Sequence, residues 1–138
     1  MKLLLDNKAD VNASSRNGVT PLYIAARNGH IDVVKLLLDK KADVNVRRHT
    51  DDATPLHVAA QNGHKDVANL LLDNNADVSA SRKDSTTPLY LAAQTGHTDV
   101  VKLLLDYKAD VNACRLNGVY CFSLWIHRCS ETVIEQQC

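Results

Sequence analysis

The sequence predicts an all-α solenoid, a fold in which similar helix pairs stack side by side. Two observations predict it. A segment beginning Thr-Pro-Leu occurs three times, with prolines at Pro21, Pro55 and Pro88, so that the period is 34 and then 33 residues. Each copy is followed by a leucine-rich segment such as 34–38. A sequence that repeats with this period forms a stack of similar units rather than one globular core.

The first helix of each unit begins at the Thr-Pro pair. Thr20 can cap a helix, and Pro21 then takes the first helical position, where its missing N–H costs nothing. The Leu-x-x-Ala-Ala pattern that follows gives one apolar face and allows a close helix contact. The Gly29-His30 pair ends the helix.

The second helix covers residues 32–38. An aspartate (Asp32, Asp66 or Asp99) lies near its N-terminus, where the helix dipole favours a negative charge. The helix ends at a turn-rich Ala-Asp-Val-Asn segment, residues 42–45 in the first full copy. One such helix pair is too small to bury its own apolar face, so neighbouring units must cover it.

These motifs, in this order, resemble the ankyrin repeat over roughly residues 1–118. The resemblance implies antiparallel helix pairs, hairpin loops that project to one side, and a concave binding surface. It divides the chain into an ankyrin array at 1–117 and a degenerate C-terminal cap or tail at 118–138. The array comprises an N-terminal half-repeat at 1–17 and full repeats at about 18–51, 52–84 and 85–117.

Two positions depart from the family pattern and should cost stability. The left-handed residue that ends the second helix is usually glycine, but here it is Lys8, Lys41, Asn75 or Lys108. A lysine there should cost about 1 kcal/mol. The glycine two residues before Thr-Pro is kept at position 18 only, and is replaced by aspartate and serine at 52 and 85. We expect a folded array that is less stable than an idealised one.

The sequence indicates no enzyme, cofactor or metal site. Residues that recur in every unit, such as His30, His64 and His97, should lie about 10 Å apart along the stack. That is too far to share a zinc ion, so we expect these histidines and the aspartates of the turns to make structural hydrogen bonds. Phosphate-loop and nucleophile-elbow motifs are absent from the sequence.

The four cysteines lie outside the repeat motifs. They are Cys114, Cys121, Cys129 and Cys138, and no two are close enough for a zinc knuckle. We expect free thiols rather than a metal site or disulfides. The 16 basic and 16 acidic residues balance, so nucleic acid and membrane surfaces are not the expected partners.

Candidate partner-binding residues lie where the units differ. The loops carry a basic stripe, and the stripe could bind an acidic protein surface. Alternatively, Asp51, Asp52 and Asp84 neutralise it locally. A second group follows Ala-Ala at the end of the first helix, whereas Tyr23 and Tyr90 are expected to pack in the scaffold. The candidates are Arg16, Arg47, Arg48, Arg82, Lys83 and Arg115 in the loops, and Arg27, Gln61 and Gln94 on the helices.

The two ends differ from the internal units. Residues 1–11 match only the second half of a unit, so the apolar face of Leu3, Leu4 and Leu5 could fray, self-associate or dock on an upstream unit. Residues 120–126 replace Thr-Pro-Leu and Ala-Ala with bulky side chains, Trp125 among them. A degenerate cap and a disrupted gene end are the two explanations.

We therefore predict a non-enzymatic protein–protein interaction module that binds its partner through the concave helix face and the loop tips. Two alternatives remain. The chain could be a fragment of a larger ankyrin scaffold or effector, or a regulatory inhibitor of a partner enzyme. A cytoplasmic location is expected, because the leading apolar segment stops at Asp6 and is no secretion signal. Delivery into a host cell stays open.

Overall fold

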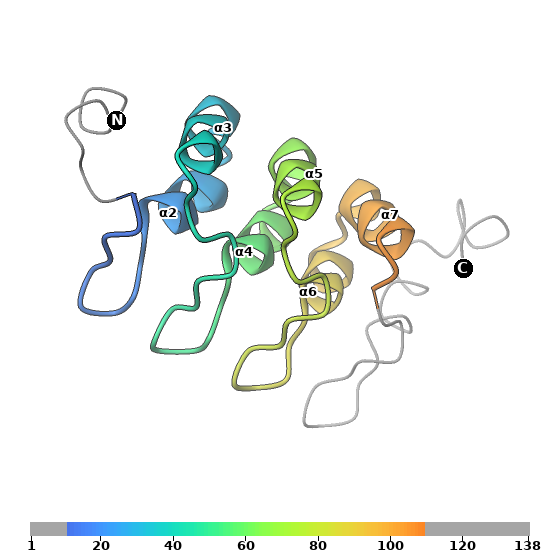
Figure 1. Cartoon of the computed structure of the whole chain (residues 1–138). Helices are drawn as coiled ribbons and strands as arrows, with labels where there is room; N and C mark the ends of the chain where they lie inside the picture. The colour runs from blue at the N-terminus through green and yellow to red at the C-terminus, as the bar shows by residue number, and fades with distance from the viewer. Residues whose placement is uncertain (1–10, 110–138) are drawn as a thin grey trace, which may run out of the picture.

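The structure is a computed structural model that describes residues 11–109, and in this range it contains six helices and no strand. The helices form three pairs that stand side by side along the molecule (Figure 1). Their bounds are α2 (Pro21–Asn28) and α3 (Ile31–Asp39), α4 (Pro55–Gln61) and α5 (Lys65–Asp73), and α6 (Pro88–Thr95) and α7 (Thr98–Asp106). The all-α solenoid predicted from the sequence is confirmed.

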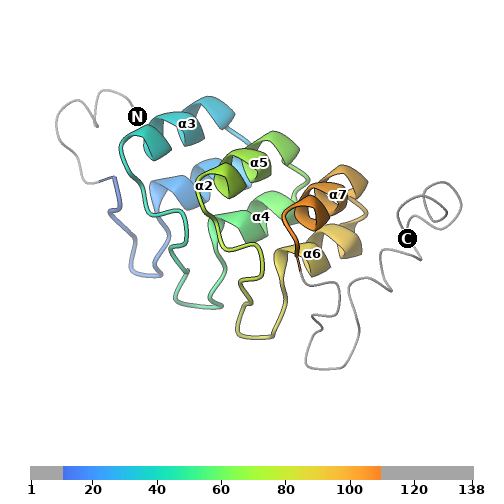
Figure 2. The ribbon, with the colours of Figure 1, turned by 45° about the vertical axis from the view of Figure 1, so that its right-hand side comes forward.

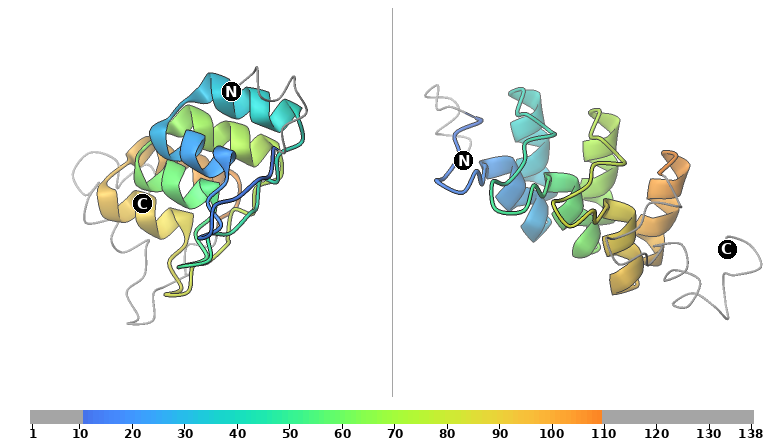
Figure 3. Two further views of the ribbon diagram at one scale, coloured as in Figure 1. Left: turned by 90° about the vertical axis from the view of Figure 1, so that its left-hand side faces the viewer. Right: turned by 90° about the horizontal axis from the view of Figure 1, so that it is seen from below.

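The helices lie in two rows, with the loops on one side. Figure 2 shows α3, α5 and α7 in one row and α2, α4 and α6 in the other, from which the long loops extend. The end-on and lower views show that these loops all leave the stack in the same direction (Figure 3). Any surface built by the first helices and the loops is therefore continuous from one unit to the next.

The first helix of each unit begins and ends as its sequence predicts. The side-chain oxygen of Thr20 accepts a hydrogen bond from the Tyr23 N–H at 3.2 Å, and the threonines that precede α4 and α6 do the same. Helix α2 ends at Gly29, whose φ of 75° lies in the left-handed region. Proline inside the cap and a left-handed glycine after the last turn fix the length of each first helix.

The second helices end at left-handed residues that are not glycine. The φ angles are 67° at Lys41, 71° at Asn75 and 66° at Lys108. Two backbone bonds close the end of α3, from Lys41 N–H to the Leu38 carbonyl and from the Ala42 N–H to the Leu37 carbonyl, both at 3.0 Å. Since lysine adopts this conformation only at a cost, the predicted strain is present.

The core runs along the stack between neighbouring units. Helix α4 packs against both α2 and α6, while α5 lies between α3 and α7. The second alanine of each Ala-Ala pair is completely buried, and so is one leucine of each second helix. The fully buried residues of these two sets are Ala26, Ala60, Ala93, Leu37, Leu71 and Leu104. Each unit thus covers the apolar face of the next one, as the repeat pattern requires.

Several predictions from the sequence fall on residues outside the described range. These are the half-repeat helix at 2–5, the candidate Arg115, the four cysteines and the C-terminal segment 118–138. Among the described helices none has the length and apolar character needed to cross a bilayer.

Candidate functional site

The turn histidines join neighbouring units. His64 Nε2 lies 3.0 Å from the carbonyl oxygen of Arg27, and His97 Nε2 lies 3.1 Å from that of Gln61. The ring of His64 also covers Gly29, where an added Cβ would come within 2.7 Å of it. The predicted structural role of His64 and His97 is confirmed. Within residues 11–109 no three His, Cys, Asp or Glu side chains are grouped so that they could hold a metal ion.

The aspartates of the turns are structural as well. Asp43 Oδ1 accepts a hydrogen bond from the Asn45 N–H at 3.0 Å, and Asp77 Oδ1 accepts one from the Ser79 N–H at 3.1 Å. The Asn45 side chain then reaches the next unit, where its Oδ1 accepts from the Asp77 N–H at 2.8 Å. These carboxylates fix the turns rather than forming an acid–base pair.

The position after Thr-Pro-Leu is buried in all three units. His57 is completely buried, and its Nε2 lies 3.1 Å from the carbonyl oxygen of Thr86 in the next unit. Burial lowers the pKa of His57 to about 4, because the charged imidazolium would lose its hydration. Tyr23 and Tyr90 are 1% and 5% exposed at the equivalent position, in keeping with their predicted packing role.

Two arginines of the basic stripe are paired inside their own loops. Arg48 forms a two-pronged ion pair with Asp51, with Nε–Oδ1 at 3.0 Å and the second contact at 2.5 Å. This hydrogen bond from Arg48 lowers the pKa of Asp51. The Arg48 guanidinium also lies 5.3 Å from the ring centre of Tyr23 in the preceding unit. Arg82 contacts Asp84 at 3.3 Å. Both side chains are half-buried, so these arginines hold their loops in shape.

Two other basic residues of the stripe connect neighbouring loops. A terminal nitrogen of Arg47 donates to the carbonyl oxygen of Ser81 at 3.0 Å. The ammonium of Lys83 donates to the carbonyl oxygen of His49 at 2.9 Å. Both side chains remain exposed, but each is already hydrogen-bonded to the adjacent unit. Arg16 lies in the first loop and is exposed.

The helix candidates lie at equivalent places in the three units. Arg27, Gln61 and Gln94 are each in the last turn of a first helix, and all three are exposed. We call them the helix-end row. The backbone carbonyls of Arg27 and Gln61 accept the histidine bonds described above. The row therefore carries exposed side chains, and at its first two positions the backbone is fixed by the neighbouring unit.

Sequence reasoning identified the charges of the loops but not their pairing partners. The ion pair between Arg48 and Asp51 has a visible signal, because the two residues are three apart in a tight loop. The contact of Arg48 with Tyr23 has no such signal in the sequence, since it joins residues from different units. The same holds for the bonds from Arg47 and Lys83 to backbone carbonyls.

The fold and the inter-unit bonds define a helical repeat protein in which each unit is a similar pair of helices joined by a short turn. A family model described as ankyrin repeats in three copies matches residues 1–48 and 47–115. The chain belongs to the ankyrin repeat family. No curated protein matches it.

Proposed function

We propose that the chain binds another protein through the helix-end row of Arg27, Gln61 and Gln94. Ankyrin repeats are generally protein–protein interaction modules. The observation that supports this surface is the contrast between the two candidate groups. Most loop cations that the structure describes are already bonded to carboxylates or carbonyls, whereas the helix-end side chains are exposed, and the backbone carbonyls of Arg27 and Gln61 are fixed by histidine bonds.

Energetics favour the row over the stripe. A partner that bound Arg48 or Arg82 would compete with Asp51 or Asp84 for the same guanidinium, so the net gain would be small. A partner that bound the side chains of the row would not have to displace an ion pair of this kind. The backbone at Arg27 and Gln61 is held in place by the His64 and His97 bonds, and a preorganised site loses less entropy on binding.

The chemistry of the row describes the partner surface. A guanidinium binds a carboxylate through paired hydrogen bonds, and each carboxamide can both donate and accept. The row therefore fits a partner segment with one acidic group opposite Arg27 and a polar backbone or amide stretch opposite Gln61 and Gln94.

The test compares three forms of the chain as immobilised baits. The first is unchanged, the second carries Arg27→Ala, Gln61→Ala and Gln94→Ala, and the third is a control with Lys35→Ala, Lys40→Ala and Lys65→Ala. The control residues are exposed and lie in a second helix or, for Lys40, directly after one. Proteins captured by the first and third baits but lost from the second are then titrated in pure form by calorimetry.

We expect the second form to bind at least about tenfold more weakly, which corresponds to about 1.4 kcal/mol. If it binds as tightly as the control, the row is not the recognition surface. A further variant, Arg16→Glu, tests the exposed cation of the first loop on its own.

A further inference from the structure

The second loop is one residue longer than the loops on either side of it. The backbone bond that closes it runs from the Arg48 N–H to the Ala53 carbonyl, five residues on, whereas the first and third loops close over four residues. Thr50 lies at the tip of this longer loop and is exposed. Its hydroxyl makes no hydrogen bond to any residue in the range 11–109, so the scaffold does not use this side chain.

The residues on both sides of Thr50 hold a cation. The ammonium of Lys83, from the next loop, donates to the His49 carbonyl oxygen at 2.9 Å, and the Arg48 guanidinium pairs with Asp51. Both cations keep unused donors. An ammonium has three N–H donors, of which Lys83 uses one, and Nη1 of Arg48 makes no hydrogen bond within the described residues. A negative group carried by Thr50 would therefore have two cations beside it.

The sequence before Thr50 suits an enzyme that attaches such a group. Arg47 and Arg48 stand three and two residues before the hydroxyl. Protein kinases that select basic substrates hold guanidinium groups at this spacing with carboxylates of their own, through paired hydrogen bonds. Arg47 is exposed, and the pair between Arg48 and Asp51 lies near the surface, where ion pairs are weak. Carboxylates of a kinase can therefore replace Asp51.

We propose that Thr50 is a phosphorylation site whose phosphate ties the second loop to the third. In the transfer, the Thr50 hydroxyl oxygen bonds to the γ-phosphorus of ATP, and the bond from this phosphorus to the ADP oxygen breaks. ADP leaves with the electron pair, and the hydroxyl proton goes to a base of the kinase. The phosphate carries a charge of about −1.5 to −2 and three acceptor oxygens. The unused donors of Arg48 and Lys83 bind these oxygens, which strengthens the contact between the loops.

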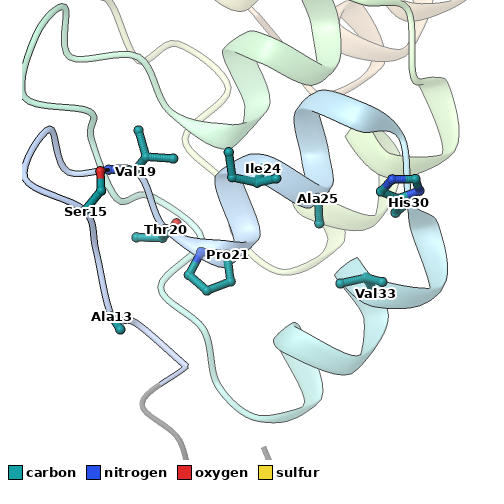
Figure 4. Close-up of a pocket in the computed structure, with 9 residues that line it drawn as sticks. All are labelled: Ala13, Ser15, Val19, Thr20, Pro21, Ile24, Ala25, His30 and Val33. Carbon is teal, nitrogen blue, oxygen red and sulfur yellow. Dashed lines mark hydrogen bonds between the residues drawn. The ribbon is translucent and has the colours of Figure 1, made fainter. Parts of the chain in front are cut away.

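The other two described loops each lack part of this arrangement. Figure 4 shows the first loop, which borders an open apolar cavity of about 710 Å³. There Ser15 stands in the place of the paired arginine and accepts a hydrogen bond from the Val19 N–H at 3.2 Å. The third loop repeats the spacing of two basic residues and a hydroxyl in Arg82, Lys83 and Ser85. Ser85, however, is half-buried, and its φ of 67° is left-handed. This serine is thus a matched control within the chain.

The first experiment tests the modification. The full chain is incubated with magnesium, ATP and the catalytic subunit of cyclic-AMP-dependent protein kinase, and mass spectrometry locates the phosphate. We expect it on Thr50, with uptake lost in Thr50→Val, slowed in Arg47→Gln and unchanged in Ser85→Ala. Circular dichroism checks that each variant is folded. A chain that takes up no phosphate, or takes it up at Ser85 as readily as at Thr50, overturns the proposal.

The second experiment tests the contact between the loops and needs no kinase. Phosphothreonine is incorporated at position 50 during synthesis, and urea midpoints are measured with and without the phosphate, both in the unchanged chain and in Lys83→Gln. We expect the phosphate to raise the midpoint of the unchanged chain, and to raise it less in Lys83→Gln and at high salt. A midpoint that stays the same or falls, or a rise of equal size in Lys83→Gln, shows that the phosphate does not join the loops and overturns the proposal.

Discussion

Replacing Lys41 with glycine should stabilise the protein, because the residue has a left-handed backbone for which lysine is poorly suited. Its φ is 67°, and its N–H closes the last turn of α3 by bonding to the Leu38 carbonyl. The side chain is exposed, so its removal uncovers no core. Glycine adopts the same conformation without a clash between Cβ and the following carbonyl oxygen.

The magnitude follows from two opposing terms. Relief of the left-handed strain contributes about 1–2 kcal/mol. The greater freedom of glycine in the unfolded chain removes about 0.5–1 kcal/mol of this. The free energy of unfolding should therefore rise by about 0.5–1 kcal/mol. Lys108, with a φ of 66°, should respond in the same way, while Asn75→Gly should gain only a few tenths because asparagine tolerates this region.

Urea denaturation followed by circular dichroism measures the effect. With a slope of about 1–3 kcal/mol per molar, the midpoint should rise by about 0.2–1 M. The matched control is Lys40→Gly, one residue earlier, where φ is −91° and any residue fits. The free energy of unfolding of that variant should fall by about 0.5–1 kcal/mol instead. If both variants shift the midpoint in the same direction, the strain argument for Lys41 is wrong.

Three further predictions concern the contacts between and within units. Because burial lowers the pKa of His57 to about 4 from 6.5, the native state disfavours the protonated ring, so stability should be full above pH 6.5 and fall by up to about 3 kcal/mol towards pH 4. Urea midpoints across this range should show a smaller fall for His57→Gln. Gly63→Ala should cost about 2 kcal/mol or more in thermal unfolding, because φ is 75° and the new Cβ would lie 2.6 Å from His97 Nδ1. Arg48→Ala should cost about 1 kcal/mol by urea denaturation through loss of the Asp51 pair and the Tyr23 contact, while Arg16→Ala in the first loop should leave the midpoint unchanged.

The fold could be predicted from the sequence because its determinants are local and occur three times. Thr20 and Pro21 specify the start of a helix, and Gly29 specifies its end, without reference to the rest of the chain. Even the strained residues were predictable. Lys41 occupies the place of a family glycine, and a repeated backbone imposes the same φ on whichever residue stands there.

The candidate site was only partly predictable, because the state of a charged side chain depends on its neighbours in the next unit. Arg47 and Lys83 have the composition of a binding stripe, but their head groups bond to the carbonyls of Ser81 and His49, residues 34 positions away in each case. Backbone acceptors carry no sequence signal. Charge counting therefore identifies which loop residues are basic and cannot separate those that connect loops from those available to a partner.

The helix-end row shows the reverse relation. Nothing in the chemistry of Gln61 or Gln94 marks them as candidates for the proposed binding row, yet their position was predictable from the repeat, since both side chains are exposed and the Gln61 carbonyl bonds to the next unit. In a stacked array, a position whose carbonyl is fixed by the neighbouring unit can change its side chain at little cost to the fold. If the proposed row binds a partner, its specificity can therefore vary at these positions, whereas the Thr-Pro, Ala-Ala and Gly-His pairs, whose side chains or conformations build the stack, cannot change without loss of stability.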